Sequence, residues 1–143
     1  HRALRWTAVL ALAEGGRLRE ARELQSRWSL RHIPTRRYWG SQFEWAQAAE
    51  LSLLLGAPRL RDAYDTLLPF EGQLIDVGTG LAVWGTVDDL LGRLAERLGE
   101  DEAAERHVAR SAAVAARVAD ALGVVPGFGS RPSTVRTHTT VPE

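Results

Sequence analysis

The chain has 143 residues, with 18 basic and 18 acidic side chains, a formal net charge of zero and 45% hydrophobic residues. This length suffices for one domain with its own core, and the balanced charge argues against a general nucleic-acid or membrane-surface footprint. Cysteine is absent, which excludes disulfides and cysteine-ligated metals and favours a cytoplasmic location, and no apolar run reaches the ~18 to 20 residues of a membrane span.

The N-terminal residues predict a first helix hairpin. Residues 2 to 14 carry an apolar stripe, and Gly15 and Gly16 then interrupt it. The helical period restarts at Leu18 and continues to Trp28. Two antiparallel helices are therefore expected.

A second hairpin is predicted to begin at Thr35 or at Ser41. Ser41 with Glu44 fits a capping box at the start of its first helix. Gly56 fits the C-terminal cap of that helix, and Pro58 suits the first turn of the next one.

A third hairpin follows a glycine-rich segment. Four glycines between residues 70 and 85 interrupt the helical pattern, so we expect a loop with one or two buried aliphatic residues. Thr86 and Asp89 resemble a capping box, and helical sequence continues from there to Leu122, with Gly99 ending the first of two helices.

A short pattern recurs along these hairpins. Arg17-Leu18-Arg19-Glu20-Ala21 returns 42 positions later as Arg59-Leu60-Arg61-Asp62-Ala63, and a weaker copy, Glu100 to Ala104, follows Gly99. Such a spacing is typical of stacked helical hairpins, in which no hairpin buries its apolar face alone. The sequence therefore predicts an all-α fold of three antiparallel helix hairpins, stacked as a tetratricopeptide-like right-handed solenoid over residues 1 to 123. Residues 124 to 143, rich in Pro, Ser and Thr, are predicted to be a flexible tail or linker.

One segment raises the alternative of an enzyme. Leu74-Ile75-Asp76-Val77-Gly78-Thr79-Gly80 resembles the glycine loop of Rossmann-type methyltransferases, which implies S-adenosylmethionine as a cofactor. Ala82 stands where a third glycine is expected, however, and two helices follow in place of a second strand. We therefore favour a glycine-rich loop between hairpins and expect no cofactor.

Other chemical signals are sparse. The four histidines are scattered and lack metal-ligand spacing. His107 lies in helical sequence beside Ala103 and Ala104, and we interpret it as a packed or half-exposed side chain. The sequence thus predicts neither catalytic residues nor a metal site.

Three segments point to a family. Ala63 to Phe70, Trp84 to Gly99 and Asp101 to His107 resemble the tetratricopeptide-like region of large bacterial signal-transduction ATPases, which include LuxR-type transcriptional regulators and ATPase-linked adenylate cyclase proteins. The resemblance covers residues 36 to 123. It implies a non-catalytic region that senses a protein partner or small inducer and restrains ATPase or DNA-binding modules outside this chain, without contacting nucleic acid or membrane itself.

A helical groove of this kind reads its ligand with side chains of the inner helices. Aromatic area and polar or cationic donors make six residues the candidates for ligand or partner binding: Arg37, Trp39, Gln42, Phe43, Trp45 and Trp84. The alternative for the tryptophans is that they fill the interfaces between hairpins.

Overall fold

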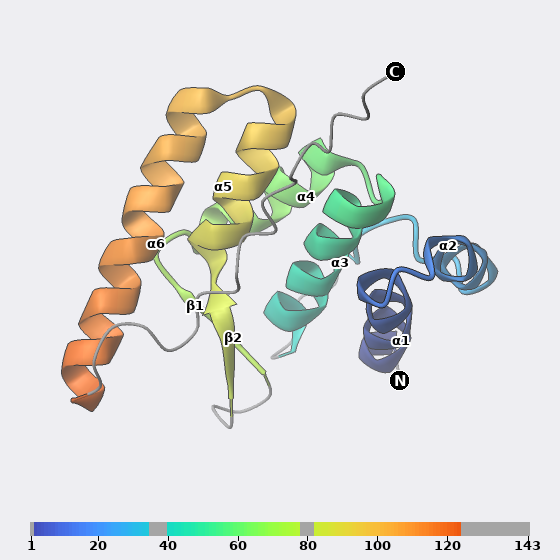
Figure 1. Ribbon diagram of the computed structural model, residues 1–143, viewed down its shortest axis with the longest axis horizontal. Coiled ribbons are helices and arrows are strands. Elements are labelled where there is room, and N and C mark those ends of the chain that lie inside the picture. Colours follow the sequence, from blue (N-terminus) through green and yellow to red (C-terminus); the bar gives the residue numbers. More distant parts are fainter. Residues whose placement is uncertain (1, 35–39, 78–81, 124–143) are drawn as a thin grey trace, which may run out of the picture.

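The computed structural model describes residues 2–34, 40–77 and 82–123, which form mostly helix. The helices are α1 (Arg2–Glu14), α2 (Leu18–Arg27), α3 (Ser41–Leu55), α4 (Leu60–Leu67), α5 (Val87–Leu98) and α6 (Asp101–Leu122). A 3-10 turn (Leu68–Phe70) follows α4, and two strands, β1 (Leu74–Asp76) and β2 (Val83–Thr86), precede α5. Consecutive helices pack into three pairs, named hairpins 1, 2 and 3, which follow one another across the molecule in chain order (Figure 1).

The recurring sequence pattern marks the same structural position in each hairpin. Its first residue is the N-cap of the second helix, and its last residue donates the first backbone hydrogen bond of that helix. The backbone N–H of the alanine donates to the carbonyl oxygen of the N-cap residue in each case: Ala21 to Arg17 (N···O 2.9 Å), Ala63 to Arg59 (3.1 Å) and Ala104 to Glu100 (2.9 Å). The repeat seen in the sequence is therefore a repeat of helix starts.

Most predicted helix ends are confirmed, and two starts are corrected. Gly56 and Gly99 adopt left-handed conformations, with φ of 75° and 76°, at the C-caps of α3 and α5. At the start of α5, Thr86 accepts a hydrogen bond from the backbone N–H three residues later, as its capping role requires. Pro58, however, precedes the N-cap of α4 and so lies outside the first turn. Ser41 is the first residue of α3, whose N-cap is Gly40 and has no side-chain cap.

The segment expected to be a glycine-rich loop contains an antiparallel β-hairpin. Leu74 pairs with Thr86 and Ile75 with Gly85, and the register shifts at the next pair, so Trp84 lies at a bulge. The fold is therefore mostly helical rather than all-α. The expectation of a buried aliphatic residue is confirmed by Ile75, which is 2% exposed.

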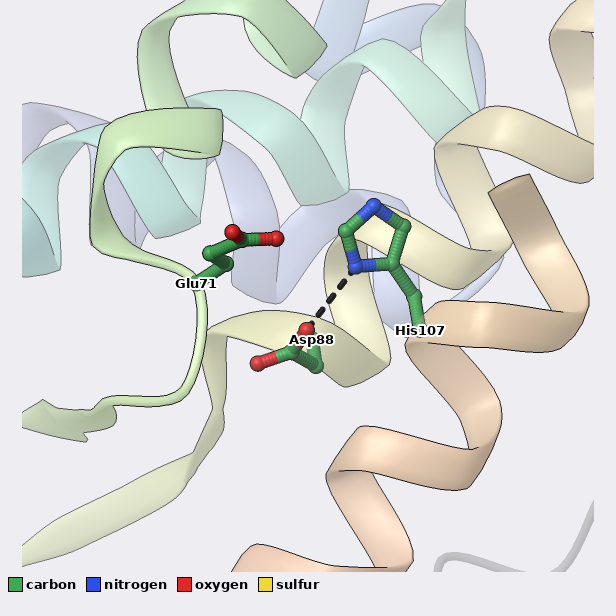
Figure 2. Close-up of side chains that lie close together, drawn as sticks. All are labelled: Glu71, Asp88 and His107. Carbon is green, nitrogen blue, oxygen red and sulfur yellow. Dashed lines mark hydrogen bonds and ion pairs between the residues drawn. The ribbon is translucent and has the colours of Figure 1, made fainter.

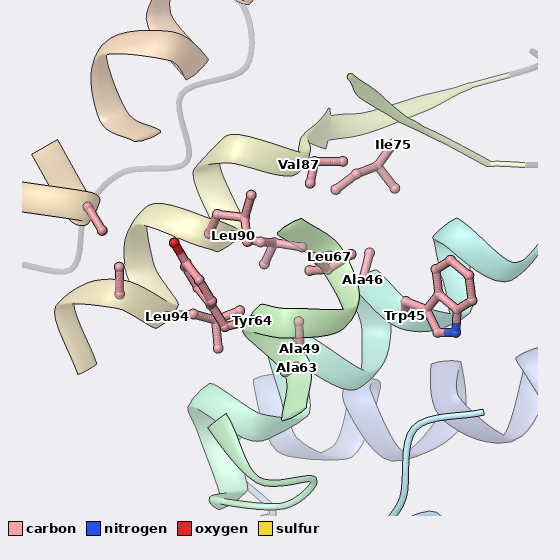
Figure 3. Close-up of a cluster of buried hydrophobic side chains, with 13 residues drawn as sticks. Trp45, Ala46, Ala49, Ala63, Tyr64, Leu67, Ile75, Val87, Leu90 and Leu94 are labelled. Carbon is pink, nitrogen blue, oxygen red and sulfur yellow. The ribbon is translucent and has the colours of Figure 1, made fainter. Parts of the chain in front are cut away.

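Two apolar clusters form the core, and α3 belongs to both. The larger cluster joins hairpins 2 and 3 and the β-hairpin (Figure 3); its members are Trp45, Ala46, Ala49, Ala63, Tyr64, Leu67, Ile75, Val87, Leu90, Leu91, Leu94, Ala95 and Ala103. The smaller cluster joins hairpin 1 to α3; its members are Trp6, Val9, Leu10, Ala13, Ala21, Leu30, Ala48 and Leu51. Because both clusters use α3, this helix is buried on most of its circumference.

The described residues bear on the expected absence of a membrane span but not on the expected C-terminal tail. None of the described helices has the length and apolar character needed to cross a lipid bilayer. The predicted tail over residues 124 to 143 lies outside the described residues. Helix α6 ends next to Gly123, which is left-handed with φ 64°.

Candidate functional site

Three ionisable side chains converge where hairpins 2 and 3 meet the β-hairpin. Glu71 lies in the turn before β1, Asp88 in the first turn of α5 and His107 in α6 (Figure 2). One potential ligand atom from each lies within 4.8 Å of the others. Asp88 and His107 are buried, and Glu71 is exposed.

Hydrogen bonds fix the proton on His107. Its Nδ1 lies 2.8 Å from Asp88 Oδ1. Because a carboxylate only accepts, Nδ1–H is the donor of this bond. The other ring nitrogen, Nε2, lies 3.1 Å from the Tyr64 hydroxyl, which donates to it in the neutral imidazole. The three side chains thus tie α4, α5 and α6 together.

The carboxylates of this cluster have partners of their own. Asp88 Oδ2 accepts a hydrogen bond of 2.5 Å from the backbone N–H of Gly72. Arg110 of α6 forms an ion pair with Glu71, and its Nε lies 4.0 Å from Asp88 Oδ1. One guanidinium therefore lies beside two carboxylates, the exposed Glu71 and the buried Asp88.

The surroundings of Tyr64 shift the pKa of its hydroxyl group. Burial raises the pKa of the Tyr64 hydroxyl above its ordinary value of 10.0, and the negative charge of Glu100 adds to the effect. Tyr64 therefore keeps its proton, and with it the hydrogen bond to His107, to a higher pH than a solvated tyrosine.

The Glu71, Asp88 and His107 cluster can be compared with a metal site and with a catalytic proton relay. A divalent cation held by Glu71, Asp88 and His107 would replace the proton on Nδ1 and displace Arg110 from Glu71. A Tyr–His–Asp relay would need its histidine within reach of a substrate, whereas His107 is 2% exposed. Since each member already has a partner, the geometry fits a structural tie between hairpins best. His107 is thus packed, as expected.

The predicted partner-binding residues separate into three groups. Trp45 is buried, donates its indole N–H to the Pro34 carbonyl at 2.8 Å and packs on Phe70, so it fills an interface. Gln42 and Phe43 are half-buried at the start of α3 and face the β-hairpin. Arg37 and Trp39 lie outside the described residues.

Gln42 and Phe43 each contact the β-hairpin. Gln42 Nε2 donates to Gln73 Oε1 at 3.2 Å, on an exposed surface. Phe43 meets Trp84 edge to face, with ring centroids 5.5 Å apart. Three of the six candidates, from segments about forty residues apart, thus share one surface, which we name the α3–β2 surface.

The methyltransferase-like segment lies in a different kind of sheet from the one that its motif requires. Leu74–Asp76 is a strand, but its partner is the antiparallel β2 in a two-stranded sheet. A Rossmann-type site lies at the carboxyl end of a parallel sheet. Gly78, Thr79 and Gly80 themselves lie outside the described residues.

Comparisons of the chain with protein-family models, with curated proteins and with solved structures found no match. Function therefore has to be inferred from the geometry of the chain itself. Sequence reasoning did not find Tyr64 or Asp88 as partners of His107, because these pairs are separated by 43 and 19 residues and belong to no motif.

Proposed function

We propose that this chain is a non-catalytic helical-repeat domain that binds a partner segment or a small inducer. In this proposal the three hairpins stack as a tetratricopeptide-like right-handed solenoid. The domain serves as the sensor or interaction region of a cytoplasmic bacterial regulator, related to the LuxR-type and adenylate-cyclase-linked ATPases. ATPase or DNA-binding modules of that regulator lie outside this chain.

The repeated helix starts support the repeat part of the proposal. The N-caps Arg17, Arg59 and Glu100 are separated by 42 and 41 residues. The first helices of successive hairpins also lie against one another, α1 against α3 and α3 against α5. Both features are typical of proteins built from stacked helical hairpins, which bind ligands through side chains on neighbouring repeats.

The observation that carries the binding part is the α3–β2 surface. It offers the rim of an aromatic pair, Phe43 and Trp84, beside the amides of the half-buried Gln42 and the exposed Gln73. Aromatic area next to hydrogen-bonding groups is the composition that dominates interface energetics. The amides suit a partner with backbone or amide groups of its own.

A binding screen tests this proposal. A displayed peptide library is selected against the whole chain, and a metabolite library is screened by thermal shift. Hits are then titrated against Gln42→Arg, which places charge and bulk on the α3–β2 surface. We expect at least a tenfold loss of affinity, because interface amides left unpaired or displaced lose their hydrogen bonds.

The matched control is Val108→Ser, at an exposed apolar position on α6. Hits should bind this variant as tightly as the unmodified chain. Hits that bind both variants equally would place the binding site elsewhere, and a screen without hits in either library would contradict the binding function.

A further inference from the structure

The interface between hairpin 1 and α3, named the α1–α3 seam, has a charged residue in an apolar stripe. Glu44, Ala48, Leu51 and Leu55 recur at i, i+4, i+7 and i+11, so they share one face of α3. Ala48 and Leu51 belong to the cluster that includes Trp6 of α1, and Leu55 packs against it. Glu44 therefore lies on the face of α3 that hairpin 1 covers.

Three polar atoms buried at this seam have no hydrogen-bond partner among the described residues: Trp6 Nε1, Glu44 Oε1 and Gln47 Oε1. Their side chains are at most 1% exposed. A buried polar group without a partner loses its hydration and gains nothing in return, and the loss is greatest for a charged one. Docking of hairpin 1 on α3 therefore leaves buried polar atoms of both α1 and α3 without partners.

The interface between hairpins 2 and 3 is built differently. Arg93 of α5 makes two hydrogen bonds to Glu50 of α3, at 2.6 and 2.8 Å. Thr86 and Ser111 join β2 to α6 through hydroxyls 2.7 Å apart. The Tyr64–His107 hydrogen bond also crosses between the two hairpins, from α4 to α6, whereas the Thr86–Ser111 pair lies within hairpin 3 and its strand. Among the described residues of this interface, no buried side-chain polar atom lacks a hydrogen-bond partner. The contrast makes the α1–α3 seam the weaker of the two interfaces.

Few polar contacts oppose separation at the seam. Between described residues, two side-chain hydrogen bonds cross from hairpin 1 to hairpin 2. Gln47 donates to Thr7 Oγ1 at 2.5 Å, and Gln25 donates to the Ala57 carbonyl at 2.6 Å. Apolar packing provides the rest of the attachment.

We propose that hairpin 1 is a displaceable cover that opens as a unit and exposes the Glu44 face of α3. Elements with few satisfied contacts open at lower free energy than the core, and helix pairs commonly open together. Trp84 packs against both apolar clusters, and hairpin 1 supplies most members of the smaller one, so opening disrupts a cluster that this ring contacts. Opening of hairpin 1 would regulate partner binding by changing the α3–β2 surface. This regulatory part of the inference rests on the proposed partner-binding function.

Native-state hydrogen exchange on the whole chain, followed by mass spectrometry, tests the opening without any partner. We expect the amides of α1 and α2 to exchange together, at least tenfold faster than those of α3 and α5. Glu44→Leu removes the buried carboxyl oxygen that has no hydrogen-bond partner and adds apolar contact, so it should slow exchange in α1 and α2 at least tenfold and leave α6 unchanged. Glu44→Gln, which keeps the shape, should act in the same direction with a smaller effect.

The matched control is Glu50→Leu, on the same helix at the paired interface. It should speed exchange in α3 and α5 and should not slow α1. Equal protection of α1 and α5 in the unmodified chain, or no slowing of α1 by both Glu44 variants, would overturn the proposal. A failed binding screen would leave this result in place, so the two proposals fail separately.

Discussion

Ala63 illustrates how one small side chain sets the distance between helices. It is fully buried where α4 meets its neighbours, at the repeat position that it shares with Ala21. Ala63→Leu would force extra methylene groups into a filled interface, and we expect a loss of about 1 to 3 kcal/mol in the free energy of unfolding. Urea denaturation measures this loss.

Ala104 provides the control, because it holds the same repeat position on α6 but is only half-buried. Ala104→Leu should therefore destabilise the chain less than Ala63→Leu. Equal effects of the two substitutions would show that burial at the repeat position does not decide the outcome.

The Tyr64 hydroxyl makes stability depend on alkaline pH. Its pKa in the folded chain is raised above the ordinary 10.0. As pH rises through about 10, tyrosine in the unfolded chain loses its proton while Tyr64 in the folded chain keeps it, so the unfolded state gains stability. The contribution is complete below pH 10 and is lost as pH rises through the raised folded pKa.

Tyr64→Phe tests this pH dependence, because the substitution removes only the hydroxyl group. Its stability at neutral pH should fall by about 1 to 3 kcal/mol, because the substitution leaves the buried Nε2 of His107 without its donor. Above pH 10 its stability should fall less steeply than that of the unmodified chain. Parallel alkaline slopes, measured by urea denaturation at several pH values, would contradict the assignment.

At the scale of elements, the Glu50–Arg93 pair holds α3 to α5. The Glu50 side chain is 6% exposed and that of Arg93 is 38% exposed. Hydrogen bonding to Glu50 raises the pKa of Arg93, with burial acting against it. Arg93→Met leaves the carboxylate buried without its cation, and we expect a loss of about 1 to 3 kcal/mol, less than for a fully buried pair because water reaches the guanidinium.

Arg93→Lys keeps the charge but not the two parallel hydrogen bonds, so its loss should be intermediate. Thermal and urea unfolding of both variants measure the series. A methionine variant as stable as the unmodified chain would show that solvent already compensates Glu50.

Helix ends could be predicted from sequence, because their signals are local. Gly56 and Gly99 need left-handed backbone, and Thr86 needs only the N–H three residues ahead. The β-hairpin has a local signal too, since Leu74-Ile75-Asp76 and Val83-Trp84 flank a glycine-containing stretch, but four glycines between residues 70 and 85 favour a loop in the sequence. The partners of His107 and the burial of Glu44 could not be predicted, because tertiary packing alone brings these side chains to their surroundings.

At the scale of the whole molecule, the two apolar clusters contain different tryptophans, whose fluorescence can report the unfolding of each cluster. Trp6 belongs to the smaller cluster and Trp28 packs against it, whereas Trp45 belongs to the larger cluster. If the seam opens separately, urea unfolding followed by tryptophan emission and by far-ultraviolet circular dichroism should give curves that do not coincide. Trp6→Phe should reduce the early emission change while the dichroism keeps its shape, whereas a single coincident transition in both signals would indicate one cooperative unit.

The regular interval between helix starts has a consequence for assembling new proteins. The connection between α4 and α5 contains a β-hairpin, yet the interval there is 41 residues against 42 for the preceding pair. Helices α4 and α5, with 8 and 12 residues, are shorter than α2 and α3, with 10 and 15, and so offset the added strands. Each hairpin carries its own glycine turn and helix N-cap, so a junction placed in a connection keeps these local signals together. The connections, rather than the turns within hairpins, are therefore the suitable junctions for chimaeras with other helical-repeat domains.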